Sequence, residues 1–163
     1  MRKIIAILMM GFSLGSVCVS VIAQQLPRFG TISIRTNFKS VGTATQTAGE
    51  HWQSQGMVMG TAFNDKGEGP LHLGPTNCSG TFFVVGTRGK GMGFCTFGDA
   101  DGDKFFVQYT GDYASSGASA GINEIIGGTG KYLGIQGKGP FKCKPAGAGG
   151  ELQCTEKFDY QLP

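Results

Sequence analysis

The chain has 163 residues, of which 40% are hydrophobic and 15% charged, and its formal net charge is +3 at pH 7. Nothing in a charge this small suggests a nucleic acid or an acidic membrane as a partner. Glycine accounts for 29 residues, well above its usual share of about 7%. These glycines follow no three-residue period and alternate with aromatic and β-branched residues, which excludes a collagen-like or disordered chain.

The beginning of the chain has the pattern of a secretory signal peptide. Two basic residues after Met1 precede an apolar run that extends to about Val19, and Val21-Ile22-Ala23 offers small residues at a cleavage site. We therefore expect residues 1–23 to be removed on export, leaving one domain over residues 24–163 and a secreted or periplasmic location. The competing interpretation, an uncleaved membrane anchor, lacks a charge cluster after the run.

The rest of the chain consists of short stretches of alternating apolar and polar residues, separated by turn signals. Such alternation indicates strands with one buried face. The predicted strands are residues 31–36, 57–63, 81–85, 92–97, 104–109, 122–126, 133–142 and 152–162. Eight hairpin-linked strands either stack as a sandwich or close as a barrel. We favour an all-β fold, a single antiparallel eight-stranded calycin-like β-barrel, because closure removes the exposed edge strands.

Four cysteines follow the signal segment, and an even number in an exported protein indicates disulfides. Cys78 and Cys95 are symmetric about one predicted turn, and Cys143 and Cys154 are symmetric about another, as cross-strand partners would be. We therefore predict Cys78–Cys95 and Cys143–Cys154 bridges. Metal binding by the cysteines is disfavoured because the chain has no Cys-x-x-Cys pair.

The segment DADGDKFF places three carboxylates, Asp99, Asp101 and Asp103, at alternate positions. This spacing matches the start of an EF-hand calcium loop, but a lysine stands where that loop requires its glycine. An Asp-Gly pair between alternating apolar residues is a stronger signal for a hairpin turn. We expect a turn, and the three carboxylates remain weak metal candidates.

The last two predicted strands carry the residues that we expect to line the barrel interior. On the final strand Glu156 lies on the apolar face and, by hairpin symmetry, opposite Phe141. A carboxyl held in an apolar barrel has a raised pKa and can exchange a proton near neutral pH. The alternative is a wet position at the rim, or a pairing with a lysine such as Lys138. The expected ligand-binding residues are Phe141, Phe158, Tyr160, Leu133 and Ile135, with Glu156 as the catalytic candidate.

Other polar side chains support weaker hypotheses. His51 and His72 could share a zinc ion, but the spacing shows no third ligand. Glu124 is a second acid within an apolar run, and its face is ambiguous. Tyr109, Tyr132 and Tyr160 could point hydroxyl groups into a cavity, although packing in the core with a satisfied hydroxyl is the commoner role of tyrosine.

Residues 127–139 read GGTGKYLGIQGKG, which invites a phosphate-loop interpretation. A Walker A loop needs serine or threonine after its lysine, where Tyr132 stands, so this interpretation fails. The segment resembles the turn-and-strand signature of the allene oxide cyclase and dirigent families of small β-barrels. The stretch from Cys95 to Asp103 and the C-terminal hairpin also look similar to secreted bacterial members. The resemblance implies an eight-stranded barrel with an apolar cavity, no cofactor and, in the plant relatives, a trimer.

Three hypotheses for function follow. The first is the binding of a small apolar molecule inside the barrel, with no nucleic-acid partner and no membrane insertion after cleavage. The second is a cofactor-free cyclase or isomerase that uses Glu156 in the same cavity. The third is a structural or protein-interaction module of the envelope whose barrel is solidly filled. The resemblance places none of the cyclases' catalytic residues on this chain.

Overall fold

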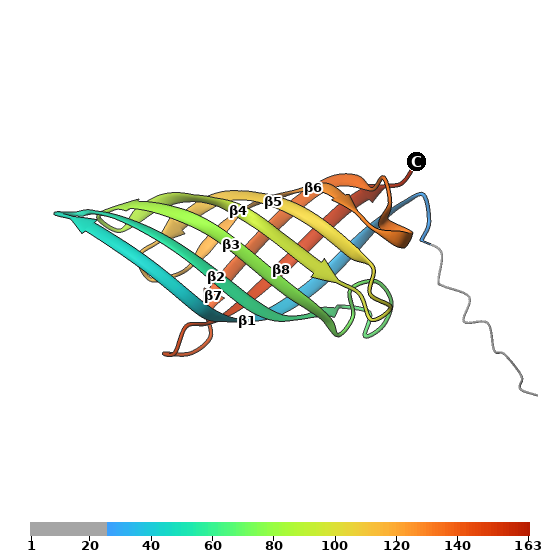
Figure 1. Cartoon of the computed structure of the whole chain (residues 1–163), viewed down its shortest axis with the longest axis horizontal. Helices are drawn as coiled ribbons and strands as arrows, with labels where there is room; N and C mark the ends of the chain where they lie inside the picture. The colour runs from blue at the N-terminus through green and yellow to red at the C-terminus, as the bar shows by residue number, and fades with distance from the viewer. Residues whose placement is uncertain (1–25) are drawn as a thin grey trace, which may run out of the picture.

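The computed structural model describes residues 26–163, and most of them belong to one closed antiparallel β-barrel (Figure 1). The predicted signal peptide lies outside the described residues. The strands are β1 (Phe29–Ala48), β2 (His51–Asn64), β3 (Gly74–Val85), β4 (Arg88–Gly98), β5 (Lys104–Ala114), β6 (Ser119–Gly128), β7 (Gln136–Pro145) and β8 (Glu151–Gln161). A 3-10 turn, η1 (Gly130–Tyr132), precedes β7. Each strand pairs with the next and β8 pairs with β1, which confirms the predicted eight-stranded barrel.

All eight predicted strands are present, but most are longer than the apolar alternation indicates. The second half of β1 and the start of β2 are rich in threonine, serine and glutamine. Beyond Ser40, β1 pairs with β2 alone, because its pairing with β8 ends at Lys39. This part of β1 projects from one end of the barrel (left in Figure 1), and its described side chains are exposed, so neither of its faces needs to be apolar.

The strand predicted over residues 133–142 begins later than expected, at Gln136. Gly130 and Gly134 have positive φ angles of 51° and 77°, and they turn the chain before the strand starts. The turn overturns the expectation for Leu133, which is 72% exposed and not on the interior face, whereas Tyr132 is completely buried, as expected of a core tyrosine.

The two ends of the barrel differ. The four tight connections that join β1 to β2, β3 to β4, β5 to β6 and β7 to β8 lie at one end, which we call the hairpin end. The longer connections, residues 65–73, 99–103 and 129–135, lie at the other end together with the C-terminus (Figure 1). We call this the plugged end. No helix within residues 26–163 has the length and apolar character that a membrane crossing requires.

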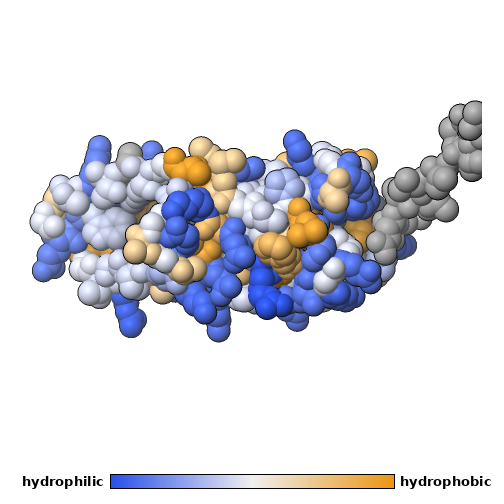
Figure 2. Space-filling model, turned by 90° about the horizontal axis from the view of Figure 1, so that it is seen from below, coloured by the Kyte–Doolittle hydropathy of each residue, from blue (hydrophilic) through white to orange (hydrophobic). Residues whose placement is uncertain are grey.

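The outer surface of the barrel is mixed in character. On the face seen in Figure 2, hydrophobic side chains form separate patches between hydrophilic ones. On the outer surface, Met57 on β2 and Met92 and Phe94 on β4 are 47%, 53% and 56% exposed. Met57 and Phe94 both lie opposite Ser79 of the intervening strand, so these apolar side chains are neighbours across three strands.

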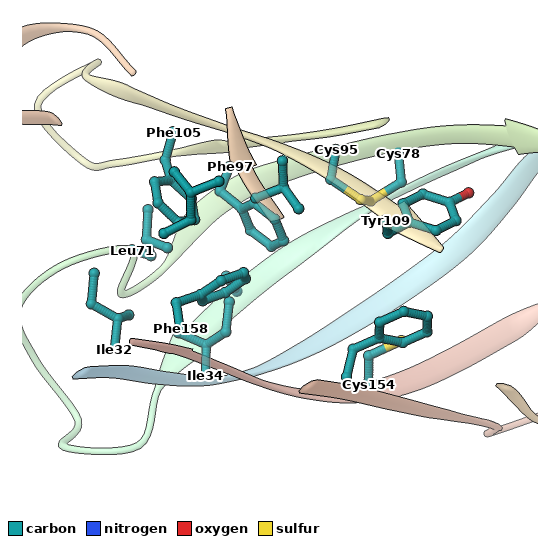
Figure 3. Packing of buried hydrophobic residues seen from close by; sticks show 14 of the residues in the cluster. Ile32, Ile34, Leu71, Cys78, Cys95, Phe97, Phe105, Tyr109, Cys154 and Phe158 are labelled. Carbon is teal, nitrogen blue, oxygen red and sulfur yellow. A yellow bond between two sulfur atoms is a disulfide. The ribbon is translucent and has the colours of Figure 1, made fainter. Parts of the chain in front are cut away.

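The interior next to the plugged end is filled by aromatic packing. The rings of Phe97, Phe105 and Phe158 contact one another edge to face, with centroids 5.0 to 6.0 Å apart (Figure 3). Tyr132 packs on Phe105 at a centroid distance of 5.7 Å. Each fully buried phenyl ring contributes roughly 1.5–3 kcal/mol to stability relative to an exposed one. Leu71, in the connection before β3, is also fully buried in this cluster.

Part of the glycine excess makes room for aromatic rings inside the barrel. Gly80 on β3 pairs with Gly93 on β4, and a Cβ at either position would overlap the Tyr109 side chain. A Cβ at Gly121 would likewise crowd the ring of Phe141. Aromatic side chains of β5 and β7 therefore pack directly against the backbone of strands one or two places away in the barrel, an approach that a β-carbon would prevent.

The DADGD segment forms the β4–β5 turn, as predicted. Gly102 has a φ of 91°, and its amide donates a 3.0 Å hydrogen bond to the carbonyl of Asp99. Among residues 26–163, no group of three or more His, Cys, Asp or Glu side chains is placed to hold a metal ion. The Lys131 ammonium instead lies 2.9 Å from Asp99 Oδ2 and 2.6 Å from Asp101 Oδ2, so its single positive charge is shared between the two carboxylates.

Residues of the glycine motif (127–139) thus hold the β4–β5 turn in place. Asp103 Oδ2 accepts a 2.9 Å hydrogen bond from the backbone amide of Lys131, and the Tyr132 hydroxyl donates a 2.6 Å hydrogen bond to Asp99 Oδ2. Burial alone would raise the pKa of Asp99, but the hydrogen bonds from Tyr132 and Lys131 hold this pKa below its usual value. These contacts show that the DADGD segment and the glycine motif together close the plugged end of the barrel.

Candidate ligand-binding cavity

The half of the barrel nearer the hairpin end contains a cavity of about 90 Å³, to which all eight strands contribute. Five aromatic side chains line it: Phe38, Phe82, Tyr109, Tyr113 and Phe141. Pockets for drug-sized ligands are usually about 300–1,000 Å³. The cavity is therefore of the size that takes a single ring or a short chain.

Both disulfides form part of the cavity wall. The Cys78–Cys95 bridge joins directly paired residues of β3 and β4, and the Cys143–Cys154 bridge joins paired residues of β7 and β8, which confirms the predicted pairing. In Figure 3 the first bridge lies beside Tyr109, and Cys154 lies across the interior. Two intact disulfides are typical of a protein that folds in an oxidising compartment.

Glu156 lies at the floor of the cavity. Along β8 the lining residues run from Leu152 through Cys154 to Glu156, and the next inward residue, Phe158, belongs to the packed aromatic cluster. Glu156 is 7% exposed and stands opposite Phe141 of β7 and Ile34 of β1. This agrees with the parity and hairpin symmetry of the sequence.

The carboxyl of Glu156 has no compensating partner. Its Oε2 is buried without a hydrogen bond, and the lysine considered as a partner, Lys138, is exposed and lies opposite Asp159. Removal from water therefore raises the pKa of Glu156 to about 8. At neutral pH the side chain is mostly a neutral carboxylic acid that can donate one hydrogen bond.

The two cavity tyrosines are neutral as well. Burial raises the pKa of Tyr109 to about 12 and raises that of Tyr113 still further. The hydroxyl of Tyr109 donates a 3.3 Å hydrogen bond to the carbonyl of Ser79. Since the four cysteines are bonded in pairs, Glu156 is the group in this cavity that titrates nearest to neutral pH.

Two of the six residues predicted to form the site line this cavity. Glu156 and Phe141 do so, while Phe158 packs in the aromatic cluster toward the plugged end. Ile135 and Tyr160 are also buried outside the cavity, and Leu133 is exposed in the turn after η1. The prediction identified the inward face of the last hairpin, but not how far along the barrel axis the solid packing extends.

Several cavity residues were not predicted from the sequence. Phe38, Val58, Phe82 and Tyr113 come from strands far apart in the chain, and only closure of the barrel brings them together. Asn123 on β6 is 3% exposed and also lines the cavity. It is a polar residue at an inward position, the same signal that identified Glu156.

The remaining candidates do not form a shared site. His51 is exposed at the start of β2, near the hairpin end, whereas His72 lies in the β2–β3 connection at the plugged end, where it packs against Phe63. The zinc hypothesis for this pair is therefore not supported by their positions. Glu124 is exposed on the outer side of β6.

Comparison of the sequence with protein-family models and with curated proteins gives no match. The fold and the cavity define the class of protein, an eight-stranded antiparallel β-barrel with a disulfide-lined interior.

Proposed function

We propose that the protein is exported and binds a small, largely apolar molecule in the cavity at the hairpin end. The observation that carries this proposal is the unpartnered Glu156 oxygen beneath five aromatic side chains. A buried polar group without a hydrogen bond costs about 1–3 kcal/mol, and a ligand that reaches the cavity floor would recover that hydrogen bond. The aromatic walls would surround its apolar part.

Export is supported by the signal-like pattern of residues 1–23 and by the two disulfides. Membership of the allene oxide cyclase and dirigent superfamily is likewise a proposal. It is supported by the motif over residues 127–139, and the closed barrel is compatible with it. The same resemblance suggests a homotrimer, which the mass measurement below also tests.

Native mass spectrometry of the protein purified from its own periplasm or medium tests the binding proposal. We expect a co-purified small molecule that is absent from Val58→Phe, because the added ring would fill a cavity of about 90 Å³. Val85→Phe, the same substitution at a 53% exposed position, should retain the molecule. A wild-type protein without bound mass, or equal occupancy in Val58→Phe, contradicts the proposal.

A second candidate is a cofactor-free cyclase or isomerase, and the pKa of Glu156, raised to about 8, favours it. A carboxyl that titrates near neutral pH is suited to general acid or base catalysis. Conversion of the co-purified molecule by the wild type, and loss of conversion without loss of binding in Glu156→Gln, would support an enzyme. Binding without conversion leaves the first proposal.

A third candidate is a protein-interaction module of the envelope. The exposed apolar side chains of Met57, Met92 and Phe94 on the outer face of β2 and β4 favour it. Analytical ultracentrifugation tests self-association through this surface. Assembly that Met92→Lys abolishes would support the module, and a concentration-independent monomer would argue against self-association.

A further inference from the structure

Glu156 is buried without a positive charge beside it. The inward residues on the neighbouring strands are Ile34 and Phe141, and none of the residues lining the cavity is a lysine, arginine or histidine. The other titratable side chains that line it are Tyr109 and Tyr113, both neutral at physiological pH. When Glu156 ionises, its charge therefore has no counter-ion within the protein.

A buried acid at the plugged end of the same barrel, unlike Glu156, has polar partners. Asp99 is also buried, at 8% exposed, yet it receives the Lys131 ammonium at 2.9 Å and the Tyr132 hydroxyl at 2.6 Å. Glu156 has neither kind of partner. The missing partner at the cavity floor is therefore a property of this site rather than of buried acids throughout the protein.

Aromatic side chains surround the space above Glu156. Tyr109 and Phe141 lie edge to face with ring centroids 6.0 Å apart. Phe82 and Tyr113 pack with ring centroids 4.4 Å apart, nearer the mouth of the cavity, which is its side toward the hairpin end. Aromatic rings attract ammonium ions electrostatically, most strongly where water is excluded. A carboxylate at the floor and aromatic walls above it are complementary to a cationic head group with an apolar body.

We propose that the ligand is a small apolar amine, bound as its ammonium ion against the Glu156 carboxylate. This inference rests on the proposed binding function and specifies its ligand class. The ammonium group would supply the counter-ion and the hydrogen-bond donors that the protein does not provide at this site. The apolar body of the ligand would be directed toward Phe38 and Leu152 at the mouth of the cavity. A neutral ligand that accepts a hydrogen bond from the protonated acid is the competing ligand class.

The two ligand classes differ in their proton balance. Because burial raises the pKa of Glu156 to about 8, the free protein holds a carboxyl proton at about pH 6.5. When an ammonium ion binds, the carboxyl O–H bond breaks, its proton passes to the buffer, and the carboxylate accepts hydrogen bonds from the ammonium. A neutral ligand leaves the carboxyl proton in place.

Isothermal titration calorimetry with benzylamine, benzyl alcohol and toluene tests the inference. These probes share a ring and differ in the head group. At about pH 6.5, in two buffers with different ionisation enthalpies, we expect the release of about one proton for each benzylamine bound and none for benzyl alcohol. The affinity for benzylamine should increase toward pH 8, approaching about tenfold per pH unit below the pKa of Glu156.

Variants separate the charge effect from packing. Glu156→Gln keeps the shape of the side chain and should abolish the proton release and weaken benzylamine binding at pH 8 by about tenfold or more, while benzyl alcohol still binds. Glu124→Gln, the same change at an exposed position outside the cavity, should bind all three probes like the wild type.

Toluene and benzyl alcohol could bind without any preference for benzylamine and without proton release. That result would overturn the inference that the ligand is an amine, but not the proposed binding function. Absence of binding by all three probes would overturn both. The proton count is measured on the wild type, so this result does not depend on the folding of any variant.

Discussion

The Tyr132 hydroxyl donates a 2.6 Å hydrogen bond to Oδ2 of Asp99, a residue 33 positions earlier in the chain. The contact joins η1 to the β4–β5 turn, and both side chains are buried. It closes the plugged end over Phe105 and leaves the cavity confined to the other half of the barrel. The packed residues of the plugged end thus form the lower boundary of the cavity.

Tyr132→Phe should destabilise the protein by about 1.5–3 kcal/mol, because the buried Asp99 carboxylate loses a charge-assisted hydrogen bond. Urea unfolding followed by the fluorescence of Trp52, the one tryptophan of the chain, measures the change. Tyr160→Phe, at another buried tyrosine of this region, should cost less than Tyr132→Phe. Equal effects of the two substitutions would show that the hydrogen bond contributes no more than ordinary packing.

Stability should decrease as the pH rises from about 5 to 8. Burial raises the pKa of Glu156 from 4.5 to about 8, so in this interval the native state holds a proton that the unfolded state releases. The contribution of Glu156 is complete below the unfolded pKa and is lost toward the folded one, with a slope approaching 1.4 kcal/mol per pH unit, an order-of-magnitude figure.

Unfolding free energies measured at several pH values check this dependence. Glu156→Gln should flatten the profile over the interval, whereas Glu124→Gln should retain the slope. The contribution of Asp99 to stability has the opposite pH dependence, since the pKa of Asp99 is lowered in the folded state. Its contribution is present above the unfolded carboxyl pKa and is lost as the pH falls below about 4. A wild-type profile that is flat from pH 5 to 8 would show that Glu156 is solvated.

Gly80→Ala should destabilise the barrel by about 1–3 kcal/mol, because the new Cβ would overlap the hydroxyl of Tyr109. Removing that hydroxyl in the double variant Gly80→Ala/Tyr109→Phe should recover part of the loss, and a double-mutant cycle gives the coupling. At Gly42 no heavy atom lies within 4 Å of an added Cβ, so Gly42→Ala should be nearly neutral. Additive single effects would exclude the contact.

Reduction of the two disulfides should lower the unfolding free energy by about 2–4 kcal/mol for each bridge. The Cys78–Cys95 bridge spans 17 positions of sequence and the Cys143–Cys154 bridge spans 11, so alanine replacement of the first pair should cost slightly more. Urea titrations of the two double-alanine variants measure the difference. Unchanged stability after complete reduction, verified by mass, would argue against this contribution.

The sequence predicts those features of the barrel that depend on local alternation. On β8, Leu152, Cys154, Phe158 and Tyr160 share the inward face, and the same parity places Glu156 among them. The cysteine pairs are symmetric about their turns, so their partners follow from the hairpins alone. These inferences need only the two-residue period of a strand.

Long-range packing could not be predicted in this way. The ammonium of Lys131 meets Asp99 and Asp101 from 30 or more positions away, so the two motifs looked independent in the sequence. The sequence places Leu133 on the interior face because the apolar alternation continues through the segment in which two glycines with positive φ turn the chain. The role of Gly80 beneath Tyr109 depends on a strand two places away in the barrel, and no local signal distinguishes it from a turn glycine.

Intermolecular nuclear Overhauser effects between toluene and the protein's methyl groups test the binding of an apolar molecule inside the barrel most directly. We predict contacts from toluene to the methyl groups of Val58 and Leu152 in the cavity and none to the exposed Met57 and Met92. Contacts confined to the exposed methionines, or absent at saturating toluene, would contradict an internal binding site.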